Sequence, residues 1–401
     1  MVKQINFDNY VIAVEQVSNG HPDAVCDIIA NSLVDAFVKG DSKSRCGIEV
    51  MMKDNIVVIG GEVYSNTVVD YDRVVRSVFE KIKYPENHHL SPNEIKIINL
   101  IGKQSMEIHN AVDISDDVIA GSDQGFMCGY ATKETETFMP LGCYITKHIC
   151  NFINTQTELE IGPDAKSQVV IEYDGIEPKR VISILVSAMH QCNLATVRNY
   201  ITEAILTNRI NLNTDIFEKF ITEEVIIDVN PAGTWRIGGS ISDCGMCNRK
   251  LACNQTSSAY RISGGGLNGK DISKLDYSGN MMCRYIAKNI VAADIADTCG
   301  VDISYSIGVV EPTSVNITLN RNKHLEKPLV EWVKKNVGLE PHNIIKRFDP
   351  TVCRYANSAI NGYYGMTEEE MEDEHNKLMY PWERFDLVDG LKYFVHDAIW
   401  Q

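Results

Sequence analysis

Positive charge is concentrated in one short, glycine-rich stretch of this chain. Residues 249–274 carry five basic side chains against one acidic residue, Asp271, although the whole chain has a formal net charge of −16. The basic residues are Arg249, Lys250, Arg261, Lys270 and Lys274, and Gly264, Gly265, Gly266 and Gly269 lie among them. Glycines allow a backbone to approach a ligand closely, and lysines neutralise phosphate charge. The stretch therefore predicts a polyphosphate site, with a solvated surface loop as the alternative.

Two other interpretations of this region are incomplete. Residues 264–270 match the first seven positions of a phosphate-binding P-loop, but Asp271 stands where Ser or Thr should hold Mg²⁺. Cys244 and Cys247 have the spacing of zinc ligands, but no second pair follows them. The sequence also has no GxSxG nucleophile motif and no GxGxxG dinucleotide motif after a strand. We therefore expect neither zinc binding nor P-loop chemistry.

A second candidate anion site is the Gly-His-Pro-Asp sequence at residues 20–23, which enters a predicted helix. The N-terminus of a helix favours an anion, and His21 can donate to a phosphate oxygen. Asp23 provides a carboxylate suited to Mg²⁺, and Asp276 provides another. Alone, His21 and Asp23 are equally consistent with a helix cap, and residues 164–166 with a charged turn.

Hairpins that alternate with helices must position these residues. We expect hairpins at 46–64 and 167–187, helices at 22–37, 68–82, 195–207 and 280–298, and strands at 5–17, 303–310 and 314–319. This order favours an α+β fold of three related units with mixed or antiparallel sheets. The acidic segment 367–375 is expected to be a solvated helix face, and residues 381–383 to anchor the C-terminal part.

Length and composition limit the class of protein. At 401 residues, with 44% hydrophobic and 23% charged residues, the chain should form two or three ordinary packed units. No run reaches the ~20 apolar residues of a membrane span, and no signal-peptide pattern is present. The 12 cysteines follow no repeating frame, which predicts free thiols in the reducing cytoplasm. The acidic balance argues against nucleic acid or an anionic membrane as a main partner.

A set of motifs in a fixed order makes nearly the whole chain resemble the S-adenosylmethionine synthetase (methionine adenosyltransferase) family. The matching stretches are residues 14–23, 60–62, 101–105, 121–125, 129–132, 163–169, 230–231, 237–239, 243–245, 249–250, 269–271, 287–293, 311–314 and 381–383. The resemblance implies that the methionine sulfur attacks C5′ of ATP and that the bound triphosphate is then hydrolysed to phosphate and pyrophosphate. Such a reaction needs alignment and fixed cations rather than an activated nucleophile.

The resemblance also implies a role for each matching residue. The catalytic residues that would grip the triphosphate are His21, Lys166, Arg249, Lys250 and Lys270. The ATP site would be completed by Asp164, Trp235, Asp243 and Gly266. Methionine would contact Glu62, Gln104, Asp123, Asp243 and Lys274. Two Mg²⁺ ions per site would be held by Asp23 and Asp276, and one K⁺ by Glu49. Residues 104–119 correspond to a mobile gate over the site.

The family fold has three similar α+β domains related by a pseudo-threefold axis, with sheets packed at a dimer interface. The implied domains are residues 1–105, 117–236 and 237–395. The implied protein is a cytoplasmic homodimer with shared active sites, or a homotetramer, that uses ATP and L-methionine and binds neither nucleic acid nor membrane. The alternative is a catalytically altered paralogue that acts as a nucleotide-binding regulatory subunit.

Five departures from the family pattern lie near the expected nucleotide site. Ala24 replaces a lysine, residues 232–235 lose a basic residue and place Trp235 where Phe is usual, and Cys247-Asn248 replaces Thr-Gly. Residues 254–260 do not match, and residues 267–268 are one residue shorter than usual. Compensated lineage drift is one interpretation, and altered nucleotide affinity, product inhibition or sulfur-substrate tolerance is the other.

Overall fold

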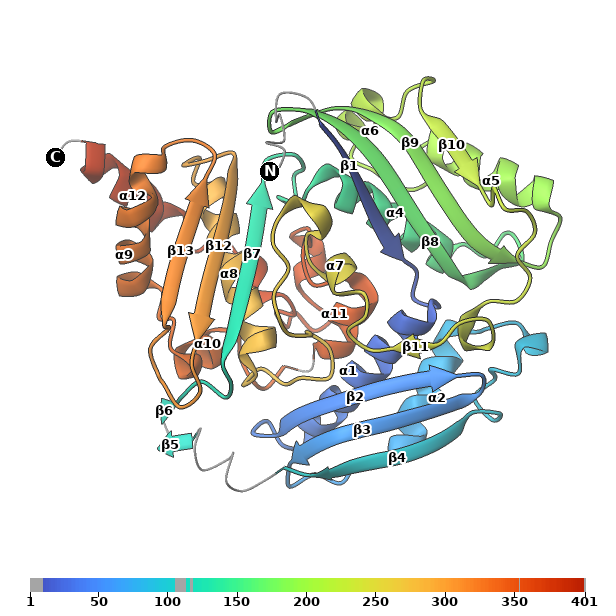
Figure 1. Ribbon diagram of the computed structural model, residues 1–401, viewed down its shortest axis with the longest axis horizontal. Helices are drawn as coiled ribbons and strands as arrows, with labels where there is room; N and C mark the ends of the chain where they lie inside the picture. Colours follow the sequence, from blue (N-terminus) through green and yellow to red (C-terminus); the bar gives the residue numbers. More distant parts are fainter. Residues whose placement is uncertain (1–9, 105–112, 116–117, 353, 400–401) are drawn as a thin grey trace, which may run out of the picture.

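Three β-sheets surround a helical centre. The computed structural model describes residues 10–104, 113–115, 118–352 and 354–399. Figure 1 shows the sheets on three sides of a centre that holds α1 (Pro22–Gly40), α7 (Leu251–Asn254) and α11 (Tyr355–Asn361). Among the described helices, none combines the length and the apolar composition that a membrane span requires.

The first sheet is mixed and carries two of the predicted site residues. Its strand order is β11 (Gly245–Met246), β2 (Arg45–Lys53), β3 (Ile56–Tyr64) and β4 (Lys96–Lys103). β2 pairs antiparallel with β3, and β3 pairs parallel with β4. Residues 46, 48, 50 and 52 are buried, and β2 packs against α1, so the strand's alternation turns Glu49 outward. The helix α2 (Tyr71–Ile82) packs on α1.

The second sheet leads the chain into α1. Its order is β1 (Tyr10–Val17), β8 (Ile161–Asp174), β9 (Glu177–His190) and β10 (Ile226–Val229). The helices that cover it are α4 (Leu141–Thr155), α5 (Leu194–Leu206) and α6 (Thr214–Phe220). Val17 lies opposite Lys166 in the β1–β8 register. The start of α1 therefore lies beside Lys166, although about 140 residues separate them in sequence.

The third sheet carries the C-terminal part. Its order is β13 (Ser314–Leu319), β12 (Thr298–Tyr305) and β7 (Gly125–Thr132), all antiparallel. The main covering helices are α8 (Leu275–Ala292) and α9 (Glu326–Asn336), followed by α10 (Pro341–Arg347) and α12 (Val388–Ile399). A separate pair is formed by β5 (Asp113–Ser115) and β6 (Val118–Ile119). Since β1, β7 and β11 each join a sheet built mostly from another part of the chain, the three units are interlocked.

The predicted hairpins are confirmed as β2–β3 and β8–β9, and α1, α2, α5 and β13 lie close to their expected ranges. Two elements had wrong boundaries at both ends. The helix expected at 280–298 is α8, which begins at Leu275 and ends at Ala292, and the strand expected at 303–310 is β12, which ends at Tyr305. Because α8 is buried on almost every side, its sequence lacks the one-sided apolar pattern that would mark its start.

The C-terminal expectations had mixed outcomes. Trp382 is an anchor as predicted, because it is 0% exposed and its indole N–H donates to the Tyr363 carbonyl at 2.7 Å. The helix expected at 367–375 was wrong, because that segment has only the 3₁₀ turn Glu369–Met371 and a bridge from Glu372 to Leu378. A run of carboxylates has no apolar stripe to bury, so little favours a helix there. The cysteines in the described part of the chain are all free thiols, as expected.

Candidate active site

The start of α1 presents His21 and Asp23 to the interior. His21 caps the helix, and its Nδ1 accepts from the Asp23 backbone N–H at 3.1 Å. Burial, followed by the charges of Lys166 and Lys250, lowers the pKa of His21 to about 4, so the ring is neutral at pH 7. Because Nδ1 is the acceptor, the ring proton is assigned to Nε2, which is left to donate to a ligand.

Asp23 is the centre of a group of charges from distant segments. Its Oδ2 lies 2.7 Å from Lys250 Nζ, and its Oδ1 accepts from the Met246 N–H at 2.9 Å and lies 3.6 Å from Arg249 Nη1. Burial alone would raise the pKa of Asp23, but the Lys250 ammonium and the Met246 N–H more than offset it, and the pKa is lowered. Asp23 is therefore an ionised carboxylate with a cation on each side.

Asp164 joins this group from β8. Its Oδ2 accepts from the Gly239 N–H at 2.7 Å, while its Oδ1 is buried without a partner. Burial raises the pKa of Asp164 to about 7, although the Gly239 N–H and Lys166 act in the opposite direction. Asp243 acts electrostatically on Asp164 and on His21, which places it beside them. We call the set His21, Asp23, Asp164, Lys166, Asp243, Arg249 and Lys250 the α1 cluster.

Trp235 lies on the loop that leads to Gly239. Its indole N–H donates to the Ile237 carbonyl at 2.7 Å, and its backbone carbonyl accepts from the His190 N–H at 2.9 Å. These two bonds fix the ring, which is half-buried and offers an aromatic face. The side chain of the next residue, Arg236, donates to backbone carbonyls at the end of β9, including the Cys192 carbonyl at 3.0 Å.

A second group of site residues lies at the start of α8. Lys270 Nζ is 2.6 Å from Asp276 Oδ2, and Gly265 lies so close to Asp276 that a Cβ there would be 2.2 Å from its Cγ. Lys270 also forms a backbone bridge with Gly47 of β2, and Gly47 is the register partner of Glu62. Glycine at 265 is therefore required by the close approach of the loop to the carboxylate.

Four of the five residues expected around methionine belong with this second group, and the fifth, Asp243, lies in the α1 cluster. Asp123 is exposed, with Oδ1 accepting from the Gln124 N–H at 2.7 Å, and the neighbouring Ser122 hydroxyl bonds to the Ser273 carbonyl at 3.5 Å. The Gln104 backbone N–H donates to the Val63 carbonyl at 3.2 Å, next to Glu62, while its side-chain Oε1 is buried without a partner. Lys274 is the N-cap residue of α8. We call the set Glu62, Gln104, Asp123, Lys270, Lys274 and Asp276 the α8 cluster.

The structure does not join the two clusters within one chain. Across the described residues, no hydrogen bond or ion pair links a side chain of the α1 cluster to one of the α8 cluster. Gly266, which is expected beside ATP, packs on Asn248, where a Cβ would lie 2.2 Å from the amide carbon. Each cluster thus holds only part of the expected triphosphate grip.

Both candidate magnesium ligands already have a cation as partner. In the described part of the chain, no three Asp, Glu, His or Cys side chains form a group that could hold a metal ion. Mg²⁺ is commonly bound by one or two carboxylates together with substrate phosphates and water. Asp23 and Asp276 therefore fit ions that arrive with a triphosphate, and do not fit a resident metal cage.

Glu49, the expected K⁺ ligand, lies on the outward side of β2. Its Oε2 is 2.7 Å from the Cys247 thiol, which donates to it, so this oxygen is partly engaged. Cys247 is one of the departures from the family pattern. Through this hydrogen bond, the substituted residue contacts the expected K⁺ ligand directly. Most of the expected gate lies outside the described residues, which omit 105–112 and 116–117.

Three residues that contact the neighbourhood of the site were given no role from the sequence. The Tyr84 hydroxyl donates to the Gly20 carbonyl, directly before His21. His88 Nε2 accepts from the Gly238 N–H at 3.2 Å, next to the Gly239 N–H that binds Asp164. Asn248 donates its backbone N–H to buried Asp27 at 2.7 Å. No local pattern marks these residues, because each acts through a partner more than 60 positions away.

The remaining departures are accommodated by local packing. Ala24 is buried and borders a small cavity that Asp27, Lys147 and Lys250 also line. In residues 254–260, Ser258 donates to the Ala13 carbonyl at 3.2 Å and Tyr260 stacks on Tyr130 at 5.4 Å. This segment therefore bridges β1 and β7, so its unusual sequence still forms an ordered contact.

Comparison with known proteins identifies the class. Residues 9–106, 118–235 and 237–375 match the N-terminal, central and C-terminal domains of S-adenosylmethionine synthetase. The S-adenosylmethionine synthase of Mycoplasmopsis pulmonis is 34% identical over 390 residues, which cover 95% of this chain and 97% of that one. The synthase of Mycoplasmopsis synoviae is 35% identical over 389 residues, covering 95% and 96% of the two chains.

A solved structure supports the same assignment. The unusual S-adenosylmethionine synthetase from Campylobacter jejuni superposes with a TM-score of 0.84 at 32% identity, covering 96% of this chain and all of that one. The chain therefore belongs to the S-adenosylmethionine synthetase family and has its three-domain α+β fold. It is a methionine adenosyltransferase, an ATP-binding transferase of S-adenosylmethionine biosynthesis.

Proposed function

We propose that this enzyme makes S-adenosylmethionine by direct attack of the methionine sulfur on C5′ of ATP, at a site shared by two copies of the chain. The observation that carries the proposal is the division of the expected site into two separate clusters. In a homodimer, the α1 cluster of one chain would face the α8 cluster of the other. Each pair of clusters would then form one complete site.

The division of charges supports a triphosphate leaving group. The α1 cluster supplies Lys166, Arg249, Lys250 and the neutral His21 Nε2–H, and the α8 cluster supplies Lys270. Fixed cations of this kind stabilise the negative charge that develops as the C5′–oxygen bond breaks. Mg²⁺ bound at Asp23 and Asp276 would neutralise further phosphate charge. The same lysines then hold the cleaved triphosphate in place for hydrolysis to phosphate and pyrophosphate.

The site needs no activated nucleophile for the first step. A thioether sulfur has no proton to lose, so alignment with C5′ accounts for much of the catalysis. We propose that Trp235 stacks on adenine, that Asp164 contacts the adenosine, and that Glu62, Gln104, Asp123 and Lys274 orient methionine. A K⁺ ion beside Glu49 and a gate at residues 104–119 complete the proposal.

A product assay on Lys270→Ala tests this proposal. The purified wild-type protein, supplied with ATP, methionine, Mg²⁺ and K⁺, is expected to release S-adenosylmethionine together with phosphate and pyrophosphate. Lys270→Ala should lower turnover at least ~100-fold, because a fixed cation at the leaving group is lost. The matched control is Lys179→Ala, which removes an exposed lysine of β9 and should leave turnover unchanged.

Three outcomes would contradict the proposal. Near-normal turnover of a folded Lys270→Ala protein would remove the role given to this lysine. Release of ADP would indicate a kinase. ATP binding without turnover by the wild-type protein would favour the regulatory subunit.

A further inference from the structure

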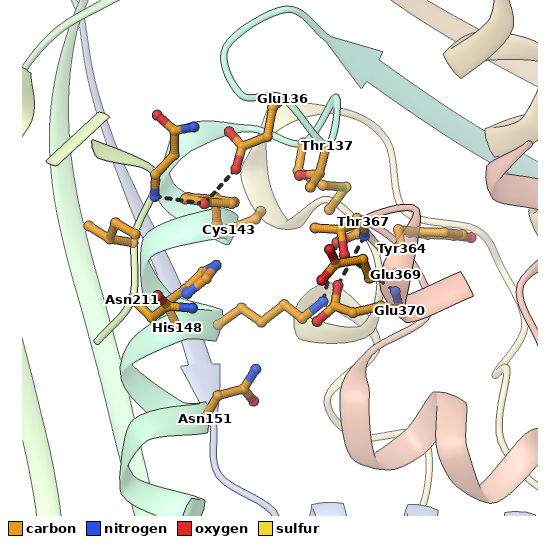
Figure 2. A pocket seen from close by; sticks show the side chains of 16 residues that line it. Glu136, Thr137, Cys143, His148, Asn151, Asn211, Tyr364, Thr367, Glu369 and Glu370 are labelled. Atoms are coloured by element: carbon orange, nitrogen blue, oxygen red, sulfur yellow. Dashed lines mark hydrogen bonds between the residues drawn. The ribbon is translucent and has the colours of Figure 1, made fainter. Parts of the chain in front are cut away.

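A polar pocket of about 370 Å³ lies between α4 and the C-terminal segment, and none of the residues of the two clusters lines it. Figure 2 shows Asn151 and His148 of α4 on one side and Glu369 and Glu370 of the C-terminal segment across from them. This volume is in the range of small-molecule sites in proteins. The pocket therefore has room for a metabolite and is walled by segments far apart in sequence.

One wall of the pocket carries a poorly compensated cation, Lys147. Its Nζ contacts the Gly365 carbonyl at 3.4 Å and the Met366 sulfur at 3.8 Å, and no described carboxylate lies within 4.0 Å of it. Burial lowers the pKa of Lys147, although Glu370 acts in the opposite direction. A partly buried ammonium whose described contacts are this long can still donate to an anionic group.

The C-terminal wall carries negative charge. Glu369 is exposed and makes no described hydrogen bond, and Glu370 accepts the Thr367 N–H at 3.0 Å with only one of its oxygens, Oε2. Glu136 also lines the pocket, and one of its oxygens, Oε1, accepts the Tyr144 hydroxyl at 2.6 Å. The two carboxylates of the C-terminal wall thus keep free acceptor oxygens and border the same cavity as Lys147.

The remaining lining adds neutral hydrogen-bonding groups and an apolar surface. The side chains of Asn151 and Asn211 line the pocket and make no described hydrogen bond. The Tyr144 ring packs on His148 at 4.4 Å, and the side chains of Met139 and Leu212 lie beside the cavity. The lining can therefore contact a small apolar body as well as two charges of opposite sign.

We propose that this pocket binds a free α-amino acid, a zwitterion whose carboxylate pairs with Lys147 and whose ammonium pairs with Glu369 and Glu370. A simple anion would satisfy Lys147 but would be repelled by the two carboxylates. A simple cation would meet the reverse difficulty. A zwitterion satisfies both, and its side chain would lie against Tyr144 and Met139. This site is separate from the methionine position of the proposed reaction.

Binding to the full-length protein tests the proposal. The probes are the proteinogenic amino acids other than methionine, at up to about 10 mM, with acetate and methylammonium as singly charged comparators. Calorimetry and thermal shift should detect at least one amino acid that binds more tightly than either comparator. Glu369→Gln and Lys147→Met should each weaken that binding about 10-fold or more, because each removes a charge-assisted contact.

Two controls separate this site from others. Lys274→Met, at the proposed methionine position, should leave the binding unchanged, and so should Lys179→Met. If Lys147→Met fails to fold, the exposed Glu369→Gln still tests the site. The proposal is overturned if no amino acid binds, or if binding is insensitive to the pocket variants. It is also overturned if acetate or methylammonium binds as tightly as the amino acids, which would indicate an anion or a cation site instead.

Discussion

A mixture of two inactive variants should recover activity if the active site is shared between chains. Lys250 belongs to the α1 cluster, where it pairs with Asp23 at 2.7 Å, and Lys270 belongs to the α8 cluster, where it pairs with Asp276 at 2.6 Å. Lys250→Ala damages the first cluster and Lys270→Ala damages the second. In a dimer of one chain of each kind, one site receives both damaged clusters and the other receives both intact clusters.

The expected recovery follows from this arrangement. Random pairing of equal amounts makes half of the dimers mixed, and half of the sites in a mixed dimer are intact. The mixture should therefore reach about a quarter of wild-type turnover. Each variant alone should stay at or below about 1%, since loss of a fixed cation costs ~100-fold. The assay is S-adenosylmethionine formation by two co-expressed chains that carry different tags.

The matched control combines two variants of the same cluster. Lys166→Ala with Lys250→Ala damages only the α1 cluster, so every site in every dimer is defective and no recovery is expected. Recovery in the control, or none in the test mixture, would refute the reasoning. The second result would mean that Lys250 and Lys270 serve one site on one chain.

Three further predictions concern the scaffold of the site. Glu383 is buried between Arg284 Nε at 3.0 Å and Lys288 Nζ at 2.7 Å, so Glu383→Ala should lower the free energy of unfolding by about 3–5 kcal/mol. Urea denaturation beside the exposed Glu374→Ala would show this, and equal midpoints would contradict it. Burial raises the pKa of Asp27 to about 7, so the folded protein keeps this proton at a pH where the unfolded chain, with a pKa of about 4, loses it. The contribution of this carboxyl to stability should therefore fall as pH rises from about 4 to about 7 in the metal-free protein, and urea midpoints of wild type and Asp27→Asn should differ in slope across that range. Tyr84→Phe leaves the Gly20 carbonyl unpaired and should raise KM for ATP roughly 5-fold with little change in kcat, whereas an unchanged KM would exclude a positioning role.

Local patterns in the sequence were sufficient for much of the fold. The β2–β3 hairpin was predicted from apolar residues on both sides of a polar turn, and the start of α1 from Pro22 after a break. The positive stretch at 249–274 predicted a polyphosphate site, which stays a prediction, and its Lys250 and Lys270 pair with Asp23 and Asp276. These features depend on residues that are close in sequence, so they can be predicted from a single amino-acid sequence.

Long-range arrangement could not be predicted in the same way. Lys250 meets Asp23 across 227 positions, while Lys270 meets Asp276 only six positions away. The two lysines are close in sequence yet fall in different clusters. Nothing in residue spacing distinguishes them. β11, just before Lys250, pairs with β2 at Met51 and Met52, whereas Lys270 bridges to β2 at Gly47, near the opposite end of the strand.

The ion pairs in both clusters also bear on how a triphosphate would bind. Each proposed magnesium ligand is paired with a proposed phosphate ligand, so the acidic and basic groups neutralise each other within the chain. On the proposed function, a metal–triphosphate complex carries both signs of charge. Its phosphates would pair with the lysine of each ion pair, and its metal ions with the carboxylate. On binding, the two ion pairs within the protein would be replaced by contacts of the lysines with phosphate and of the carboxylates with Mg²⁺. The affinity for ATP would therefore depend on the difference between these two sets of contacts and not on the net charge of the chain. A chain of net charge −16 could in this way bind a polyanion.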